Sequence, residues 1–93
     1  MSKLNLGRSC WIFLHNLAEN WSEIDNYNTE SNFKSFMYFL SEIYPCDKCR
    51  IHMKKYFDKH PIVAKNKKEI KLYLCNFHNA VNLRLNKPIF KCN

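Results

Sequence analysis

The sequence predicts an all-α protein, a small four-helix bundle in one domain. Apolar residues recur every three or four positions in four separate segments, which is the pattern of amphipathic helices. No segment sustains the alternation of apolar and polar residues that a half-buried strand requires. The chain has 93 residues with one glycine and three prolines, which argues against a fold rich in hairpins. Four such helices with short connections are typical of a helical bundle.

A polar stretch separates the first two helices. The first is expected over about residues 6–20, with this apolar set: Trp11, Leu14 and Ala18, flanked by Phe13 and Leu17. Residues 22–32 are polar and predict a connection, with Asp25, Asn26 and Asn28 as turn formers. The second helix is expected to start at a Ser31 cap and to end near Tyr44. Its apolar residues are Phe33, Phe36, Met37, Leu40 and Ile43.

Prolines bound the last two helices. Pro45 has no backbone N–H, so it ends the second helix or opens the third. The third helix is expected over about residues 46–59, before Pro61, with these apolar residues: Ile51, Met53, Tyr56 and Phe57. The fourth is expected over about residues 66–85, before Asn86 and Pro88, with these: Ile70, Tyr73, Leu74, Phe77, Val81 and Leu85. Residues 89–93 are expected to be irregular.

Charge and hydropathy limit the classes of partner. Fifteen lysines and arginines against eight acidic residues give a formal charge of +7, which favours an anionic partner such as nucleic acid, a membrane surface or a phosphorylated cofactor. Nucleic acid is disfavoured because no binding module is recognisable and the basic residues are not concentrated on one element. No apolar run approaches the ~20 residues of a membrane span. Residues 1–7 contain no apolar signal region, so we expect an intracellular protein.

The most informative motif is Cys46-Asp-Lys-Cys49, at the expected start of the third helix. There the helix dipole favours a thiolate on Cys46, the form that attacks disulfides, and Cys49 would be the less accessible cysteine. The same pair would supply half of a zinc site, which Cys75 and His78 would complete as a Cys₃His set, with His52 as a competing ligand. A structural disulfide or inert thiols are the third possibility, and the motif alone leaves all three open.

The fourth helix carries a cluster of polar ring and amide groups. His78 and Asn82 are four residues apart and share a face, Asn79 lies beside them, and Lys87 follows. This arrangement fits a planar polar heterocycle attached to phosphates. A single helical histidine is more often structural, and it is the density of the cluster that favours a ligand.

Three motifs, in this order, resemble the Erv/ALR family of FAD-dependent sulfhydryl oxidases. Gly7-Arg8-Ser-Cys-Trp11-Ile-Phe-Leu-His15 resembles the family's first-helix flavin motif. Tyr44-Pro45-Cys46-Asp-Lys-Cys49-Arg-Ile-His52 resembles its redox-active CxxC. The stretch from Cys75 to Lys87, centred on His78-Asn79-x-Val81-Asn82, resembles its FAD-binding helix. The resemblance covers roughly residues 7–92 and identifies residues 1–93 as a single domain, in a minimal form similar to viral members.

The resemblance implies a four-helix bundle with FAD at its mouth and a C-terminal tail tied back by a Cys75–Cys92 disulfide. That bridge would close a loop of ~18 residues, worth roughly 3 kcal/mol. Cys46 and Cys49 would be catalytic, with Cys46 facing the substrate and Cys49 facing the flavin, and no metal is expected. The implied cofactor-binding residues are Gly7, Arg8, Trp11, His15, His52, Cys75, His78, Asn79, Val81, Asn82, Leu85 and Lys87.

The implied reaction is the oxidation of thiols to disulfides. A substrate thiolate attacks Cys46 of the oxidised pair, the mixed disulfide resolves, and Cys49 passes two electrons to FAD and on to O₂, giving H₂O₂. The implied partners are a thiol-containing protein substrate or a thioredoxin-like carrier, O₂, and a second copy of the chain in a homodimer. The implied compartment is the host cytoplasm or virion for a viral protein, or alternatively the mitochondrial intermembrane space.

The sequence also departs from the family pattern. It ends one residue after Cys92, without the further helix that helps to close the adenine end, so we expect a more exposed adenine. Cys10 stands where a small hydroxyl residue is more frequent, and we expect a free, buried thiol or, alternatively, an intermolecular bridge. Asn86 replaces a frequent glycine and tolerates left-handed backbone geometry. Two other hypotheses are a Cys₃His zinc module that contacts an anionic partner and a degenerate family member that binds FAD as an assembly factor.

Overall fold

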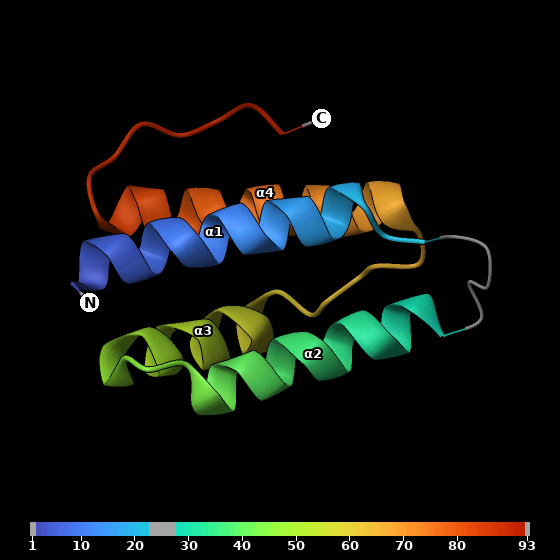
Figure 1. Cartoon of the computed structure of the whole chain (residues 1–93), viewed down its shortest axis with the longest axis horizontal. Helices are drawn as coiled ribbons and strands as arrows, with labels where there is room; N and C mark the ends of the chain where they lie inside the picture. Colours follow the sequence, from blue (N-terminus) through green and yellow to red (C-terminus); the bar gives the residue numbers. More distant parts are fainter. Residues whose placement is uncertain (1, 23–27, 93) are drawn as a thin grey trace.

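Four α-helices make up the computed structural model of the chain: α1 (Lys3–Glu19), α2 (Thr29–Ile43), α3 (Asp47–Lys59) and α4 (Lys67–Arg84). The structure describes residues 2–22 and 28–92, and these contain no strand. Helices α1 and α4 lie side by side in one layer, and α2 and α3 form the other (Figure 1). The predicted all-α, four-helix fold is confirmed. None of the helices in the described ranges is long and apolar enough to cross a membrane.

Side-chain caps explain where three of the helices begin. Ser2 accepts a hydrogen bond from the Asn5 N–H at the start of α1, and Asn66 accepts one from the Glu69 N–H at the start of α4. At the start of α3 the capping atom is the Cys46 sulfur, which accepts from the Cys49 N–H at 3.3 Å. The Cys46-Asp-Lys-Cys49 motif therefore also starts its own helix.

The predicted start of α2 at Ser31 is wrong, because the helix begins at Thr29. Thr29 is only 3% exposed, and the carboxylate of Glu30 accepts a hydrogen bond from the Ala64 N–H at 2.9 Å. These contacts with the rest of the bundle hold two residues in the helix that the sequence placed in a connection. Asn28 is the N-cap position, as its turn-forming character suggests, while Asp25 and Asn26 lie outside the described residues.

The core is apolar and draws on every helix. Its buried residues are Leu14, Ala18, Phe33, Met37, Met53, Phe57, Ile62, Ala64, Ile70, Tyr73, Leu74 and Phe77. Ile62 and Ala64 come from the α3–α4 connection, which the helical pattern did not predict. Three residues of the predicted apolar faces are exposed instead: Ile43, Ile51 and Leu85. Phe13, which flanks the first of these faces, is exposed as well. A bundle this small buries a narrow stripe on each helix, so residues at the edge of the stripe reach solvent.

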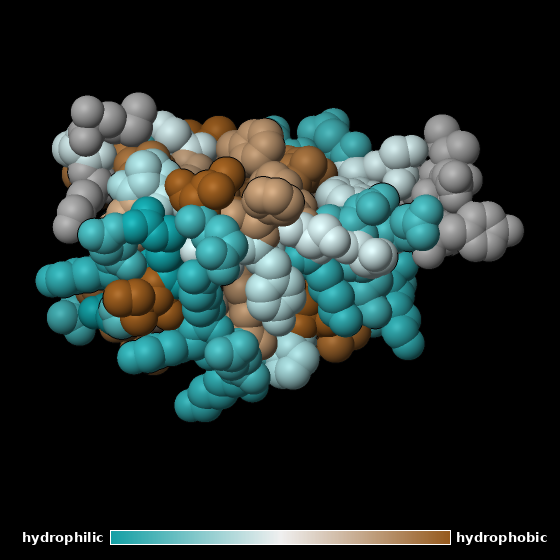
Figure 2. Space-filling view, turned by 90° about the horizontal axis from the view of Figure 1, so that it is seen from below, coloured by the Kyte–Doolittle hydropathy of each residue, from teal (hydrophilic) through white to brown (hydrophobic). Residues whose placement is uncertain are grey.

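On the face formed by α2 and α3, hydrophobic surface shows between hydrophilic side chains (Figure 2). The exposed large apolar residues of these two helices are Tyr38, Phe39, Ile43 and Ile51. Scattered apolar side chains are normal on a soluble protein, but a row of them on one helix marks a surface that another element can cover.

The chain turns back sharply after α4. Asn86 adopts a left-handed conformation with φ of 58°, the N–H of Asn86 donates to the Leu83 carbonyl, and the N–H of Lys87 donates to the Asn82 carbonyl. This is the Schellman arrangement that ends helices, with asparagine in the position usually held by glycine. The tail then runs back along the outer side of α4 (Figure 1).

Candidate functional site

A cavity of about 910 Å³ is lined by α1 from Leu4 to Asn16, by the second half of α4 and by the start of α3, together with Leu40 and Tyr44 from the end of α2. This volume lies in the range of pockets that hold cofactors and other small molecules. Twelve of the predicted site residues line it: Gly7, Arg8, Trp11, His15, Cys46, Cys49, His52, His78, Val81, Asn82, Leu85 and Lys87. The two predicted residues that do not line the cavity are Cys75 and Asn79.

Cys46 and Cys49 form a disulfide in the cavity wall. Cys46 is the N-cap of α3, where unpaired N–H groups and the helix dipole favour a thiolate once the pair is reduced. The prediction that Cys49 is the less accessible cysteine is wrong: Cys46 is 8% exposed, whereas Cys49 is half-buried. Cys46 is folded into a tight turn, in which its N–H donates to the Tyr44 carbonyl at 2.7 Å, and Cys49 lies one turn along α3 beside the cavity.

Arg50 braces the turn that carries the two cysteines. Its guanidinium donates to the Tyr44 carbonyl and to the Asp47 carboxylate, and its backbone N–H donates to the Cys46 carbonyl at 3.0 Å. One side chain thus joins the residue before Pro45 to a residue between the cysteines. Arg50 was not among the predicted site residues, because the Tyr44 carbonyl becomes its neighbour only when the turn folds.

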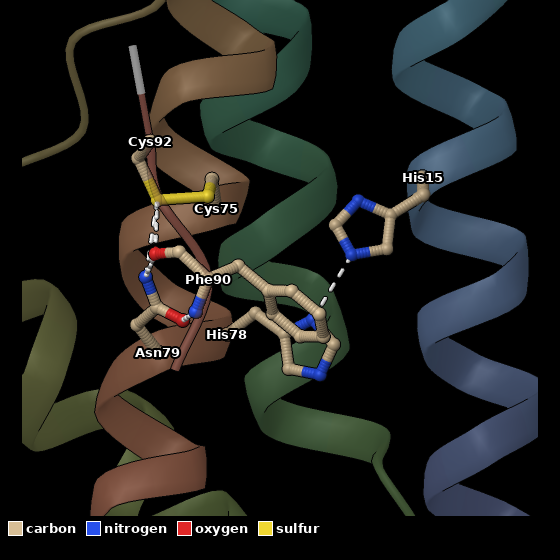
Figure 3. Close-up of a disulfide and its surroundings, with 6 residues drawn as sticks. All are labelled: His15, Cys75, His78, Asn79, Phe90 and Cys92. Carbon is tan, nitrogen blue, oxygen red and sulfur yellow. Dashed lines mark hydrogen bonds between the residues drawn. A yellow bond between two sulfur atoms is a disulfide. The ribbon is translucent and has the colours of Figure 1, made fainter. Parts of the chain in front are cut away.

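Three planar side chains meet on one wall of the cavity. The rings of Trp11 and His78 stack with their centroids 3.9 Å apart and 10° between the planes. Nε2 of His15 on α1 lies 3.0 Å from Nδ1 of His78 on α4, so one imidazole donates and the other accepts (Figure 3). Burial lowers the pKa of both histidines, and the charge that His15 carries when protonated, together with the charge of Lys87, lowers that of His78 further. Both rings are therefore neutral at pH 7.

Cationic groups also line the cavity. Arg8 comes from α1, and Arg84 and Lys87 come from the end of α4 and the turn after it. His52 on α3 lines the cavity too, and its pKa is lowered by burial first and then by the charge of Arg84 and of neighbouring lysines. The sequence analysis missed Arg84, although its position three residues after Val81 places both on one helical face.

Cys10 and Tyr44 form a second polar contact at the cavity wall. Their side chains interact where α1 meets the turn before Cys46. Burial raises the pKa of the Cys10 thiol, and burial followed by the charge of Cys10 raises the pKa of Tyr44 to about 12. Cys10 is free, as predicted, but half-buried rather than buried.

The two predicted site residues outside the cavity hold the tail. Cys75 forms a disulfide with Cys92, as the resemblance implied. The side-chain amide of Asn79 makes two hydrogen bonds with the backbone of Phe90: Nδ2 donates to the carbonyl at 2.6 Å, and Oδ1 accepts from the N–H at 2.8 Å (Figure 3). These contacts bring the Phe90 ring to 5.7 Å from that of His78.

The structure does not support the proposed zinc site. Its Cys₃His set needs Cys46, Cys49 and Cys75 as thiolates, but all three are in disulfides, and Cys75 is paired with a residue outside the set. Within residues 2–22 and 28–92, no three histidine, cysteine or acidic side chains gather in a way that could hold a metal ion.

This arrangement, a redox-capable disulfide beside a cavity lined by planar rings and cations, agrees with the comparison to known families. The model of the Erv1/Alr family matches residues 8–93. The chain belongs to the Erv1/Alr family. The solved structure of the yeast Erv1 core superposes with a TM-score of 0.92 at 32% identity, covering 100% of this chain and 79% of that one.

Curated members of the family include plant and viral proteins. The FAD-linked sulfhydryl oxidase ERV1 of Arabidopsis thaliana is 37% identical over 92 residues, which are 99% of this chain and 48% of the relative. The FAD-linked sulfhydryl oxidase of African swine fever virus (isolate Pig/Kenya/KEN-50/1950) is 33% identical, over 92% of this chain and 72% of the relative. The chain spans about half the length of its plant relatives and of the fungal relatives named mitochondrial.

Proposed function

We propose that this domain is an FAD-linked sulfhydryl oxidase that forms disulfides in thiol-containing substrates. The observation that carries the proposal is the Cys46–Cys49 disulfide in the wall of a cavity of about 910 Å³. A short-range disulfide of this kind can exchange with a substrate thiol, and the cavity beside it has the size and the side chains for a flavin dinucleotide.

The chemistry of the cavity fits FAD. A flavin and an adenine are planar, and Trp11, His15 and His78 offer planar surfaces and imidazole nitrogens. The diphosphate is anionic, and the side chains proposed to hold it are Arg8, His52, Arg84 and Lys87. The other proposed contacts are lining residues of the first-helix motif and of the motif from Cys75 to Lys87: Gly7, Val81, Asn82 and Leu85. When bound, FAD supplies a two-electron acceptor that O₂ can reoxidise, giving H₂O₂.

The two cysteines carry the exchange with substrate. A substrate thiolate attacks the Cys46 sulfur, the bond between Cys46 and Cys49 breaks, and Cys49 leaves as a thiolate. A second substrate thiolate then attacks the substrate sulfur of the mixed disulfide, and Cys46 leaves as a thiolate. The substrate gains one disulfide and loses two electrons, which reduce the pair. The start of α3 stabilises the Cys46 thiolate, so Cys46 leaves the mixed disulfide more readily than a cysteine without this stabilisation would.

The position of each cysteine supports a division of roles. Cys46 lies at the helix end, in the turn that follows Tyr44, and we assign it to the substrate. Cys49 lies further along α3 beside the cavity, and we assign it to the cofactor. Cys46 is only 8% exposed, and we propose that a substrate reaches its sulfur at the turn that follows Tyr44.

A homodimer is part of the proposal. Phe36, Phe39 and Ile43 follow one another at helical spacing along α2, and the Phe13 ring of α1 lies 6.1 Å from that of Phe36. Phe13, Phe39 and Ile43 are more than half exposed, so together they form an apolar strip across two helices. A second copy would cover it, and light scattering after size exclusion measures whether it does.

The proposed substrate follows from the chemistry of the disulfide, and the proposed compartment follows from the relatives. The proposed substrates are cysteine pairs in proteins or in a thioredoxin-like carrier, with O₂ as the final oxidant. Fungal relatives are named mitochondrial and other relatives are viral. We propose an intracellular location, in the mitochondrial intermembrane space or, for a viral protein, in the host cytoplasm or the virion.

Visible absorbance tests the function directly. The purified protein is expected to be yellow, and its flavin absorbance is expected to bleach under anaerobic conditions when dithiothreitol is added and to return on exposure to air. Oxygen consumption with dithiothreitol measures turnover. A colourless protein after reconstitution with FAD would contradict the proposal, and a yellow protein that does not bleach would support the assembly-factor hypothesis instead.

A further inference from the structure

A second hollow, of about 480 Å³, lies over the first half of α4 and the tail. Its lining consists of Lys67, Lys68, Lys71, Leu72, Lys91 and the Cys75–Cys92 disulfide. No residue lines both this lysine-lined hollow and the cavity, which uses the other half of α4. An occupant of the lysine-lined hollow would therefore leave the Cys46–Cys49 pair accessible.

Positive charge is concentrated in this hollow. Lys71 is paired with Glu19 of α1, whose Oε2 lies 2.7 Å from Nζ of Lys71. The hydrogen bond and charge of Lys71, followed by the charge of Lys67, lower the pKa of Glu19. The nearby carboxylate of Glu69 accepts a hydrogen bond from the Lys65 N–H. No ion pair within residues 2–22 and 28–92 involves Lys68 or Lys91, and anions are attracted to the charge of these two lysines.

Two features of the fold bring these lysines together, although the start of a helix disfavours positive charge. Lys67 and Lys68 are in the first turn of α4, where the helix dipole is already positive and acidic residues are favoured. Lys91 is far away in sequence and is brought to α4 by the adjacent Cys92 disulfide and by the hydrogen bonds between Asn79 and Phe90. A bound anion would relieve the repulsion that this arrangement produces.

The rest of the lining identifies the kind of anion. Leu72 is 40% exposed and, with the disulfide, gives the hollow an apolar floor beneath the lysines. None of the lining residues is aromatic, so nucleic-acid bases would have no ring on which to stack. Lysine ammonium groups are flexible point charges that suit separate carboxylates.

We propose that the lysine-lined hollow is a docking site for an acidic segment of a partner protein, in which glutamate or aspartate side chains pair with Lys68, Lys91 and their neighbours and an apolar side chain contacts Leu72. The proposal is independent of the redox reaction, since it uses none of the residues that line the cavity.

Fluorescence anisotropy with a labelled peptide of alternating glutamate and leucine tests the proposal on the complete protein. The K68Q/K91Q variant is expected to weaken binding roughly five- to tenfold, because it removes two of the four cations. The control, K34Q/K54Q, has the same net charge but alters lysines that pair with Glu30 and Glu42 outside the hollow, and it is expected to bind like wild type. Equal loss in the two variants would overturn the proposal, since binding would then follow net charge alone.

Two further measurements define the ligand. Leu72→Ser is expected to weaken binding of the glutamate–leucine peptide while leaving binding of an all-glutamate peptide unchanged, and an unchanged affinity for the mixed peptide would refute the apolar floor. An oligothymidylate is expected to compete poorly, and competition equal to that of the unlabelled mixed peptide would identify a phosphate site instead. Circular dichroism checks that each surface variant keeps the wild-type helix content.

Discussion

The two disulfides of this protein differ in their positions on the helices, and the proposed function gives them different roles. Cys46–Cys49 is closed within a single turn at the start of α3, beside the cavity. Cys75–Cys92 joins the middle of α4 to a tail seventeen residues away, outside the cavity. The first constrains little of the unfolded chain and sits where a thiolate is stabilised, whereas the second closes a long loop. Local electrostatics and loop length therefore support the proposal that one bond exchanges with substrate and the other stabilises the fold.

The largest effect is expected from removing either cysteine of the first pair. Cys46→Ser and Cys49→Ser should each lower thiol oxidation by ~10³-fold or more, because neither single thiol can complete the exchange. Oxygen consumption with dithiothreitol measures this, and flavin absorbance should persist. Substantial turnover in either variant would contradict the assigned roles.

Cys92→Ser should lower the stability of the protein and leave its turnover almost unchanged. Loss of the second disulfide should cost about 3 kcal/mol in the free energy of unfolding, because the unfolded chain is no longer constrained. Turnover per flavin should stay near that of the wild type. Urea unfolding followed by circular dichroism gives the free energy, with the wild type under reducing conditions as the matched comparison. A variant as stable as the oxidised wild type would show that the tail bridge contributes nothing.

Asn86 contributes to the stability of the tail separately from the disulfide, because its left-handed backbone turns the chain back along α4. Asn86→Ala should lower the free energy of unfolding by about 1 kcal/mol, while Asn86→Gly should keep or raise it. Thermal unfolding of the two variants measures the difference. Equal stabilities would mean that the turn is held by the disulfide alone.

The smallest effect is a pH dependence of stability from the imidazole pair. Burial lowers the pKa of His15 and His78 below the ordinary value of 6.5, so the unfolded chain binds more protons as the pH falls through that value. Stability should therefore decline below about pH 6.5 and level off once the folded-state pKa is passed. In His78→Gln this decline should be shallower, which denaturant titrations at a series of pH values would detect. The same pH dependence of stability in His78→Gln and in the wild type would contradict the inference that the two imidazoles are neutral in the folded protein.

Much of the candidate site was predictable because it consists of short motifs on helices. Spacing within a helix places Trp11 with His15 and His78 with Asn82, and the cavity contains all four. Arg84 was not predicted, although helical spacing places it on the same face of α4 as Val81. Asn79 was predicted beside the ligand, but its amide holds the backbone of Phe90, a contact that exists only after the tail folds back.

Residue periodicity and spacing along the chain were enough to predict the four helices, the three motifs with their cysteines, and the resemblance to the family. Tertiary structure alone decided which cysteine is less exposed, where α2 begins, and that Lys91 joins the lysines of α4. Each of these depends on contacts between segments far apart in sequence, and local periodicity carries no information about such contacts.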